Sequence, residues 1–196
     1  MIDDADPYPW PYDGAIDPRR LAGVVAGAQR AWTARSVGAG EVSVVIAEVA
    51  AAVRSAGGVV VHLRHGTART TRGELPPPPG STEWQLFAAP EEGDLVVDAG
   101  GIDGFHGSPL DEVLRARGLD HLVLVGYGAE AAVDSTMRAA NDRGYECLVL
   151  SDATAPFDPD TGAHALSSVT MSGGIFGAVA TSAAFLAALP LALEVP

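Results

Sequence analysis

The stretch that most constrains the fold of this chain is HLVLVGYGAEAAVDSTMRAANDRGYECLVL, residues 121–150. Residues 121–125 form an apolar, partly β-branched run that is typical of a buried parallel strand. A Gly-Tyr-Gly turn follows, residues 129–141 favour a helix, and Gly144 suits the left-handed cap that ends one. Residues 145–150 favour a second strand. The stretch therefore predicts a strand–turn–helix–strand unit.

The start of this helix is a place where many enzymes carry a nucleophile. Free backbone N–H groups at a helix amino terminus stabilise a thiolate or an oxyanion. Here the first turn holds Ala129, Glu130, Ala131 and Ala132, with no thiol or hydroxyl among them. The unit therefore predicts the platform for a nucleophile without the nucleophile itself.

Strands and helices are expected to alternate along the rest of the chain. Apolar runs predict strands at 21–26, 59–63 and 94–97 and a short strand after Gly174, whereas helical spacing predicts helices at 42–56, 109–118, 163–172 and 182–189. Loops are expected at 27–41, 67–90 and 151–161. This order predicts a three-layer α/β/α fold with a mainly parallel, Rossmann-like sheet, whose site lies beyond the carboxyl ends of the strands.

Domain organisation follows from length and composition. Residues 1–19 are rich in Pro, Asp and aromatic side chains and are expected to form an arm, which Tyr8, Trp10 and Tyr12 could hold against the body or against a neighbouring subunit. Residues 20–196 are expected to form a single domain, because 196 residues with 47% hydrophobic content suffice for one buried core.

Charge and cysteine use exclude several classes of partner. A net charge of −13 disfavours nucleic acid and anionic membranes. The single cysteine fits a reducing compartment and the amino terminus lacks a signal-peptide pattern, so we expect a cytoplasmic protein. Polar and proline residues interrupt the apolar tract at 175–193, so we expect no membrane span. No cofactor is expected. His62 and His65 do not predict a metal site, because residues three apart on a strand point to opposite faces.

Several segments together resemble the isochorismatase-like cysteine hydrolases, and within them the amidohydrolases that act on biuret, ureidoacrylate and N-carbamoyl compounds. The most specific is GLDHLVLVGYGAEAAVDSTMRAANDRGYECLVLSDAT, residues 118–154, and the resemblance extends over residues 8–189. Matching segments occur in the expected order, namely PYPWPYDGAIDP, STEWQ, GGIDGFHGSPLDEVLRARG and GGIFG. The resemblance implies the same α/β fold, a small-molecule ligand and a homo-oligomer.

The resemblance also implies an Asp–Lys–Cys catalytic triad, and this chain lacks all three residues. The Asp position, in a pattern like D-x-Q, is Gly27; the Lys position, six residues before Phe105, is Ala99; and the Cys position is Ala132. The chain contains no lysine, and its only cysteine, Cys147, lies within an expected core strand. The missing side chains predict a wider and more apolar pocket.

Other residues are candidates for replacement chemistry or for ligand binding. The candidates for an acid or base are Glu130, Asp103, His106 and Tyr127. Each has a structural alternative. Glu130 could simply complement the helix dipole, Asp103 and His106 could be surface residues of one loop, and Tyr127 could be an ordinary packing residue. The residues expected to line the ligand pocket are Trp84, Gln85, Phe105, Gly128 and Ala129.

Three functions remain open on the sequence. The leading hypothesis is a pseudoenzyme that lacks cysteine-hydrolase activity and binds a small molecule or a partner, such as an active homologue. The second is an enzyme of the same fold with non-covalent acid–base chemistry, for example cyclisation, isomerisation or dehydration. The third is residual amide hydrolysis by activated water, with Glu130 as the base.

Overall fold

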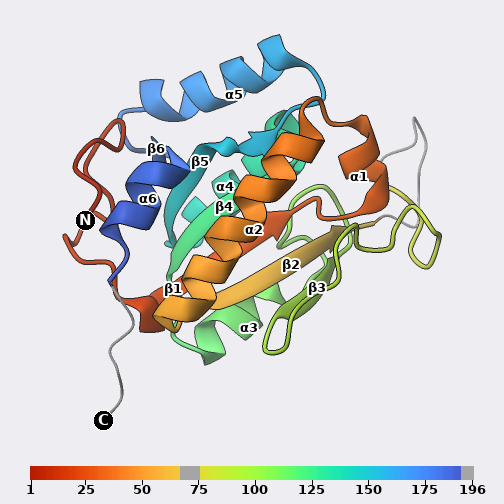
Figure 1. Cartoon of the computed structure of the whole chain (residues 1–196), viewed down its shortest axis with the longest axis horizontal. Helices are drawn as coiled ribbons and strands as arrows, with labels where there is room; N and C mark the ends of the chain where they lie inside the picture. Colours follow the sequence, from red (N-terminus) through yellow and green to blue (C-terminus); the bar gives the residue numbers. More distant parts are fainter. Residues whose placement is uncertain (67–75, 191–196) are drawn as a thin grey trace.

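A computed structural model describes residues 1–66 and 76–190 and shows a six-stranded sheet with the strand order β3-β2-β1-β4-β5-β6 (Figure 1). All of the paired strands are parallel, so the predicted α/β fold is confirmed. The strands are β1 (Leu21–Ala26), β2 (Val59–His65), β3 (Leu95–Ala99), β4 (His121–Tyr127), β5 (Glu146–Ala155) and β6 (Ala178–Ala180).

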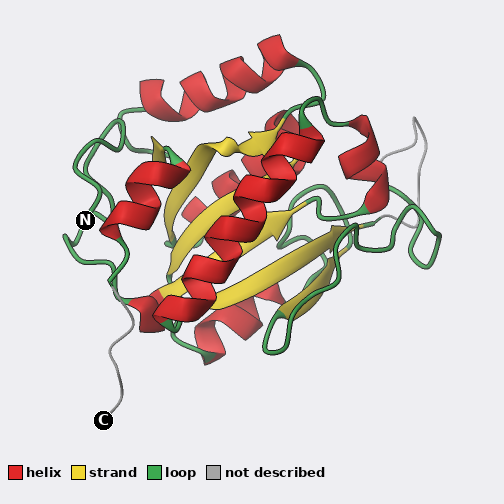
Figure 2. Ribbon diagram, in the orientation of Figure 1, coloured by secondary structure: helices red, strands yellow, loops and turns green. Residues whose placement is uncertain are grey.

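Helices cover both faces of this sheet (Figure 2). In the view of Figure 1, α2 and α6 lie in front of the strands, α3 and α4 lie behind them, and α5 runs above β5 and β6. The helical segments are η1 (Pro18–Arg20), α1 (Arg30–Arg35), α2 (Ala39–Ala56), α3 (Leu110–Ala116), η2 (Ala129–Val133), α4 (Asp134–Asn141), α5 (Pro159–Met171) and α6 (Ser182–Ala188). The predicted three-layer arrangement is therefore confirmed.

The core is centred on β1 and β4, whose residues are all buried. These two strands occupy the middle of the sheet, where both faces are covered by helices, and this explains their continuous apolar sequence. Gly23 suits this position, because a Cβ there would already lie 3.4 Å from Val53 on α2. The close approach of α2 to the sheet thus depends on a small residue in β1.

Three segments differ from the sequence-based expectations. Residues 30–35, expected within a loop, form α1, in which Trp32 and Thr33 are buried. The strand expected to end at residue 150 continues as β5 to Ala155, after a register irregularity opposite Leu124 and Gly126. The helix expected over 129–141 begins with a π-helical turn, η2, before it continues as α4. Tertiary packing of Trp32 and pairing with β4 supply the stabilisation that local sequence did not reveal.

The amino-terminal arm is tied to the body at several points. Asp6 forms an antiparallel bridge with Val179 of β6, Trp10 is completely buried, and the Tyr8 hydroxyl donates a 3.0 Å hydrogen bond to Glu146. Tyr12 is 82% exposed, so its side chain does not hold the arm against the body of the same chain. Residues 67–75, which belong to the loop expected at 67–90, lie outside the described residues.

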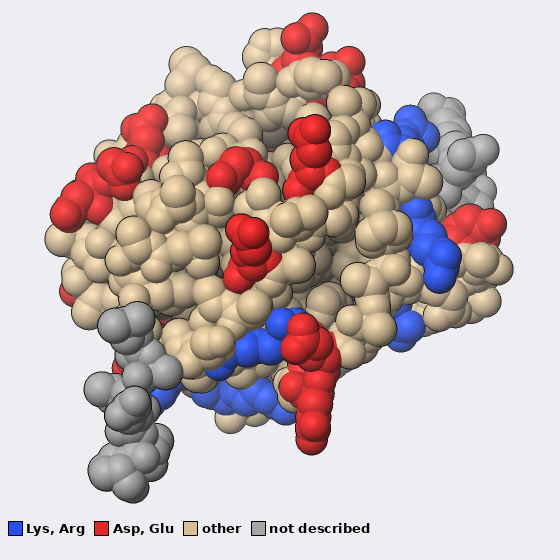
Figure 3. Space-filling view, in the orientation of Figure 1, with Lys and Arg blue, Asp and Glu red and all other residues tan. Residues whose placement is uncertain are grey.

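The surface reflects the acidic composition. On the face shown in Figure 3, Asp and Glu are spread widely, from the top and left to a group at the lower centre, whereas Arg side chains gather along the lower and right edges. Within residues 1–66 and 76–190, no helix combines the length and apolar character that crossing a membrane requires.

Candidate functional site

The three positions that the resemblance assigns to the triad lie at the carboxyl end of the sheet. Gly27 directly follows β1, Ala99 is the last residue of β3, and Ala132 lies in η2 directly after β4. Because the strands are parallel, their carboxyl ends share one edge, which is the usual location of the site in such folds. Ala132 is completely buried and Ala99 is 5% exposed. None of the three side chains can act as a nucleophile, acid or base.

Position 27 also has no room for a side chain. Gly27 adopts φ +63°, and a Cβ built on it would lie 2.5 Å from the carbonyl oxygen of Tyr127 and 3.4 Å from Cδ2 of Trp32. Both the left-handed conformation and the contact with backbone oppose any larger residue. The prediction that the missing side chains leave extra volume is therefore wrong at this position, because the β4 backbone and an indole ring occupy the space.

Trp32, which the sequence reasoning missed, fills the region beside the triad positions. Its ring stacks on Phe157 at 5.4 Å, and a Cβ at Gly128 would lie only 2.8 Å from the indole. Trp32 is 1% exposed, and its Nε1 has no hydrogen-bond partner among the described residues. A tryptophan three residues after Gln29 was the available signal, but the surrounding segment lacked a recognisable helical pattern.

His65, at the end of β2, lies next to this indole with a ring-centroid separation of 5.6 Å. The buried Gln29 side chain holds its backbone, because the amide nitrogen of Gln29 donates to the His65 carbonyl at 3.0 Å and its oxygen accepts from the His65 N–H at 2.7 Å. The His65 side chain is completely buried and its Nδ1 lies 3.2 Å from the Gly101 carbonyl.

The protonation state of His65 follows from this environment. Burial lowers the pKa of its imidazole to about 4, although the hydrogen bond to Gly101 opposes the shift. At neutral pH the ring is therefore uncharged, Nδ1 carries the proton that is donated to the carbonyl, and Nε2 is an acceptor. Nε2 has no partner among the described residues. Trp32 and His65 thus present one unpaired donor and one unpaired acceptor.

Glu130 is engaged by the start of α5. Its carboxylate accepts hydrogen bonds from the backbone N–H of Phe157 at 2.9 Å, from that of Asp158 at 3.1 Å, and from the Thr161 hydroxyl at 3.1 Å. Such bonds satisfy backbone N–H groups at a helix amino terminus. The geometry therefore supports the structural interpretation of Glu130 more than a role as acid or base.

Asp103 and His106 do not form a side-chain pair in the described structure. The Asp103 carboxylate accepts from the Phe105 N–H at 2.7 Å, which is a local turn contact, and His106 is exposed. Phe105, predicted to line the ligand pocket, instead packs against Tyr145 with ring centroids 5.6 Å apart. It belongs to the core behind the sheet, because the turn after β3 directs the ring toward the start of β5.

The remaining predicted pocket residues are divided between two regions. Ala129 is buried beside the triad positions, and the Gly128 N–H donates to the Ala155 carbonyl at 2.8 Å. Trp84 is partly buried and stacks against Arg64 at 3.7 Å, and Gln85 is exposed and lines an open groove. Tyr127 is buried, but its hydroxyl bonds to Ser43 of α2 at 2.6 Å.

The described residues form neither a metal site nor a reactive thiol. His62 bonds to Asp94 and His65 to Gly101, so the two imidazoles do not converge on one ion, and no cluster suited to a metal occurs in residues 1–66 and 76–190. Cys147 is 1% exposed, and burial raises the pKa of its thiol far above the ordinary value. Cys147 is therefore a core residue.

Comparison with known proteins assigns the chain to a family. The isochorismatase domain model matches residues 22–184, so this chain belongs to the isochorismatase family. The ureidoacrylate amidohydrolase RutB of Methylobacterium radiotolerans is 37% identical over 119 residues, which cover 60% of this chain and 45% of that protein. The chain therefore matches somewhat less than half the length of this curated relative.

Solved structures agree with this assignment. An isochorismatase family protein from Burkholderia thailandensis is 29% identical, with a TM-score of 0.76 over 89% of this chain and 97% of that one. A cysteine hydrolase from Pseudomonas syringae, 24% identical, has a TM-score of 0.78 over 89% of this chain and 94% of that one, and shows the likeness of the fold. The predicted family and its hydrolase fold are confirmed.

Proposed function

We propose that this protein is an isochorismatase-family member that has lost cysteine-hydrolase chemistry and binds a small neutral molecule beside Trp32 and His65. Covalent amide hydrolysis needs a nucleophile, a base that activates it and an acid for the leaving nitrogen. Gly27, Ala99 and Ala132 supply none of these groups, and Cys147 is buried within β5.

The observation that carries this proposal is the backbone at Gly27. A simple substitution at an otherwise intact site would leave space for the ancestral side chain. Here the Tyr127 carbonyl lies 2.5 Å from where a Cβ would be, so the surroundings have adapted to the absence of a side chain. This supports a long-standing loss of the acid–base group rather than a single inactivating change.

The unpaired atoms of Trp32 and His65 support a retained binding role. A buried polar group without a partner costs about 1–3 kcal/mol, and the two rings lie 5.6 Å apart, so a molecule that bonds to both atoms would be favoured. An uncharged carboxamide or ureide carries an acceptor oxygen and a donor nitrogen on the same carbon. The named substrate of the relative, ureidoacrylate, contains such a ureide group.

Non-covalent acid–base catalysis is the second candidate, and one observation favours it. Of the four acid–base candidates, Tyr127 lines a cavity and carries a titratable hydroxyl. Burial raises its pKa, with the Ser43 hydrogen bond opposing, so the phenol remains protonated at neutral pH and could act only as an acid. Glu130 is held by α5, so hydrolysis by activated water has weaker support.

Two measurements on the purified protein test the leading proposal. We expect no hydrolysis of ureidoacrylate or biuret under conditions in which the Methylobacterium amidohydrolase turns ureidoacrylate over. We also expect biuret binding by calorimetry, weakened about five- to tenfold by Trp32→Phe, which removes one hydrogen-bond donor but keeps a ring. Trp10→Phe is the matched control, since Trp10 is also buried with an unpaired Nε1 but lies in the amino-terminal arm. Turnover comparable to the relative would overturn the loss of catalysis, and equal effects of the two substitutions would overturn the binding site.

A further inference from the structure

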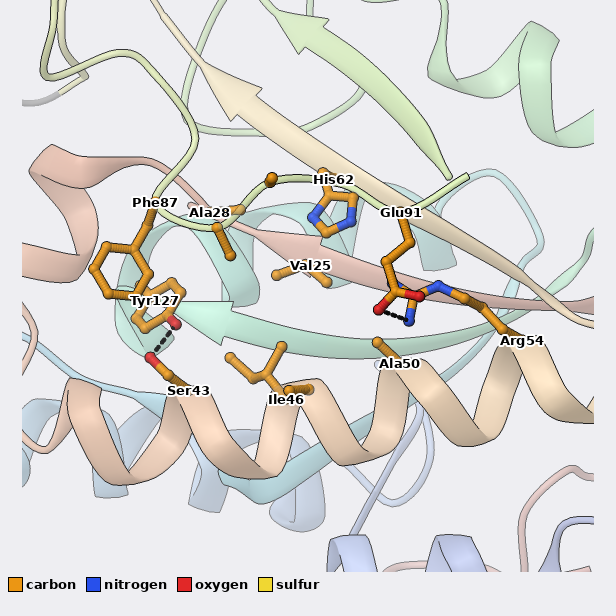
Figure 4. Close-up of a pocket in the computed structure, with 13 residues that line it drawn as sticks. Val25, Ala28, Ser43, Ile46, Ala50, Arg54, His62, Phe87, Glu91 and Tyr127 are labelled. Atoms are coloured by element: carbon orange, nitrogen blue, oxygen red, sulfur yellow. Dashed lines mark hydrogen bonds and ion pairs between the residues drawn. The ribbon is translucent and has the colours of Figure 1, made fainter. Parts of the chain in front are cut away.

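A cavity lies between α2 and the sheet, and the residues that line it include Tyr127 and Ala28, which is next to Gly27 (Figure 4). Its volume is about 130 Å³, and its walls come from β1, β2, β4, α2 and the segment that precedes β3. Val25 pairs with His62 on one side and with Val125 on the other, so these residues share the α2 face of the sheet. Tyr127, two residues beyond Val125, points to the same face.

The walls of this cavity are mostly apolar. Val25 forms its floor, Ile46 and Ala50 face it from α2, and Phe87 closes the end nearest Tyr127 (Figure 4). Alanine at positions 47 and 50 leaves space where a larger side chain would pack. The volume is close to that of an engineered apolar cavity of about 150 Å³ that binds benzene. A single aromatic ring is therefore the size of ligand that fits.

Tyr127 and Ser43 form the polar end of the cavity beside Phe87. The Ser43 hydroxyl donates to the Ala39 carbonyl at 2.6 Å, so the 2.6 Å contact between Ser43 and Tyr127 takes its proton from the phenol. The phenol hydrogen is thus committed to Ser43. This end of the cavity therefore offers no free hydroxyl donor to a ligand. The hydrogen bond to Ser43 holds the Tyr127 ring in a fixed position beside the cavity.

His62 supplies the polar group at the other end. Its Nε2 lies 2.8 Å from the Asp94 carboxylate, whose two oxygens also accept from Arg54 at 2.8 Å each. Asp94 is only 1% exposed and remains ionised, because these bonds outweigh the effect of burial and lower its pKa to about 2. The Asp94 carboxylate engages Nε2, so Nδ1 is the ring nitrogen that is left for a ligand among the described residues.

The charged groups around His62 limit the charge that a ligand in this cavity can carry. Arg54 is already paired with Asp94 and, at 3.1 Å, with Glu91, so no unpaired cation among the lining residues is available for an anion. One arginine and two carboxylates leave an excess of negative charge at this end. A carboxylate ligand is therefore disfavoured, whereas an uncharged hydroxyl, which can both donate and accept a hydrogen bond, suits Nδ1.

We propose that this cavity is a second ligand site, for a neutral one-ring aromatic molecule whose hydroxyl forms a hydrogen bond with Nδ1 of His62. The site is independent of the function proposed for Trp32 and His65. Phenol itself is the simplest probe, and toluene has nearly the same shape without the hydroxyl. Benzoate has a similar ring with a negative charge.

Backbone NMR titration of the full chain locates the binding. Phenol is expected to shift the amide signals of Ala50 and Phe87, while benzoate leaves them unchanged. Shifts confined to the neighbourhood of Trp32 and His65 would overturn the second site and assign phenol to the first. Stronger shifts with benzoate than with phenol would overturn the proposed ligand class.

Two filling variants test the cavity itself. Ala50→Leu places a larger side chain in the space and is expected to weaken phenol binding at least tenfold, and Ala47→Leu, at a more exposed lining position, serves if the first variant does not fold. Ala51→Leu is the matched control, because it adds the same volume to the exposed side of α2. Phenol affinity unchanged by the filling variants, or reduced equally by the control, would overturn the assignment.

His62→Phe tests the hydrogen bond. The ratio of toluene to phenol dissociation constants, measured in the same protein, is expected to fall about fivefold, as the net value of one hydrogen bond implies. General loosening of the fold affects both ligands and cancels in this ratio. An unchanged ratio would overturn the role of His62 as the hydrogen-bond partner of the ligand.

Discussion

The carbonyl oxygen of Tyr127 lies 2.5 Å from the position that the Cβ of any side chain at residue 27 would occupy. This relationship joins the ends of β1 and β4, which are neighbours in the sheet. It explains why restoring the family's aspartate is more than a change of one side chain. Either the β4 backbone moves or position 27 remains glycine.

Gly27→Asp should therefore destabilise the protein without restoring hydrolysis. Strain at positive φ and overlap with backbone together predict a loss of roughly 2–5 kcal/mol in the free energy of unfolding. Gly118→Asp is the control, because Gly118 has nearly the same φ, +67°, with nothing within 4 Å of its Cβ position. It should lose about 1 kcal/mol. Equal losses in urea denaturation would contradict the steric explanation.

Glu130→Gln tests whether Glu130 is a structural residue. The substitution removes the charge that accepts hydrogen bonds from the start of α5, so we expect a loss of about 1–2 kcal/mol in the free energy of unfolding. Glu48→Gln, on the exposed side of α2, should change it by less than about 0.5 kcal/mol. If both variants unfold at the wild-type temperature, the carboxylate is free for another role.

The Asp94 network should make stability depend on pH in the acid range. The pKa of Asp94 falls from 3.8 to about 2 because the bonds from Arg54 and His62 outweigh burial. Ionised Asp94 thus stabilises the folded state fully above about pH 4, and this contribution is lost as the pH falls toward 2.

Asp94→Asn should accordingly lower the free energy of unfolding by about 2 kcal/mol at pH 7, and the difference from wild type should shrink toward pH 2. The exposed pair of Asp98 and Arg64 provides the control, since Asp98→Asn should cost less than about 1 kcal/mol. Denaturant titrations at several pH values measure both. A difference that stays constant between pH 5 and pH 2 would rule out this linkage.

Cys147 should be inert in the folded protein. Burial raises the pKa of the thiol, with the neighbouring Glu146 contributing, so the reactive thiolate is scarce even at pH 8. A disulfide reagent should label the folded chain slowly and reach one thiol per chain once guanidinium unfolds it. Rapid stoichiometric labelling without denaturant would show that this cysteine is accessible.

Much of the fold was evident from local sequence. The continuous apolar runs of β1 and β4 and the glycine-rich turns after them predict buried parallel strands, because side-chain periodicity and backbone freedom are properties of short segments. The absence of the triad remains a prediction, which rests on the spacing of Gly27, Ala99 and Ala132 from motifs in the same segments.

Candidate roles were harder to predict. Glu130 suits both a binding site and a helix start, and only the approach of α5, 27 residues away, decides between them. Trp32 was missed because α1 is short and its stabilisation comes from Phe157 and His65, which are distant in the sequence. Phe105 carried no sign that its ring packs against Tyr145.

By itself, the sequence determined the order of strands and helices and the family, and it predicted that the three catalytic side chains are absent. Only the tertiary structure decided that position 27 has no space for a side chain, and that His62 meets Asp94 beside an apolar cavity. The physical reason is that short-range patterns determine which segments form strands and helices. Free volume and hydrogen-bond partners instead depend on atoms brought together from distant segments.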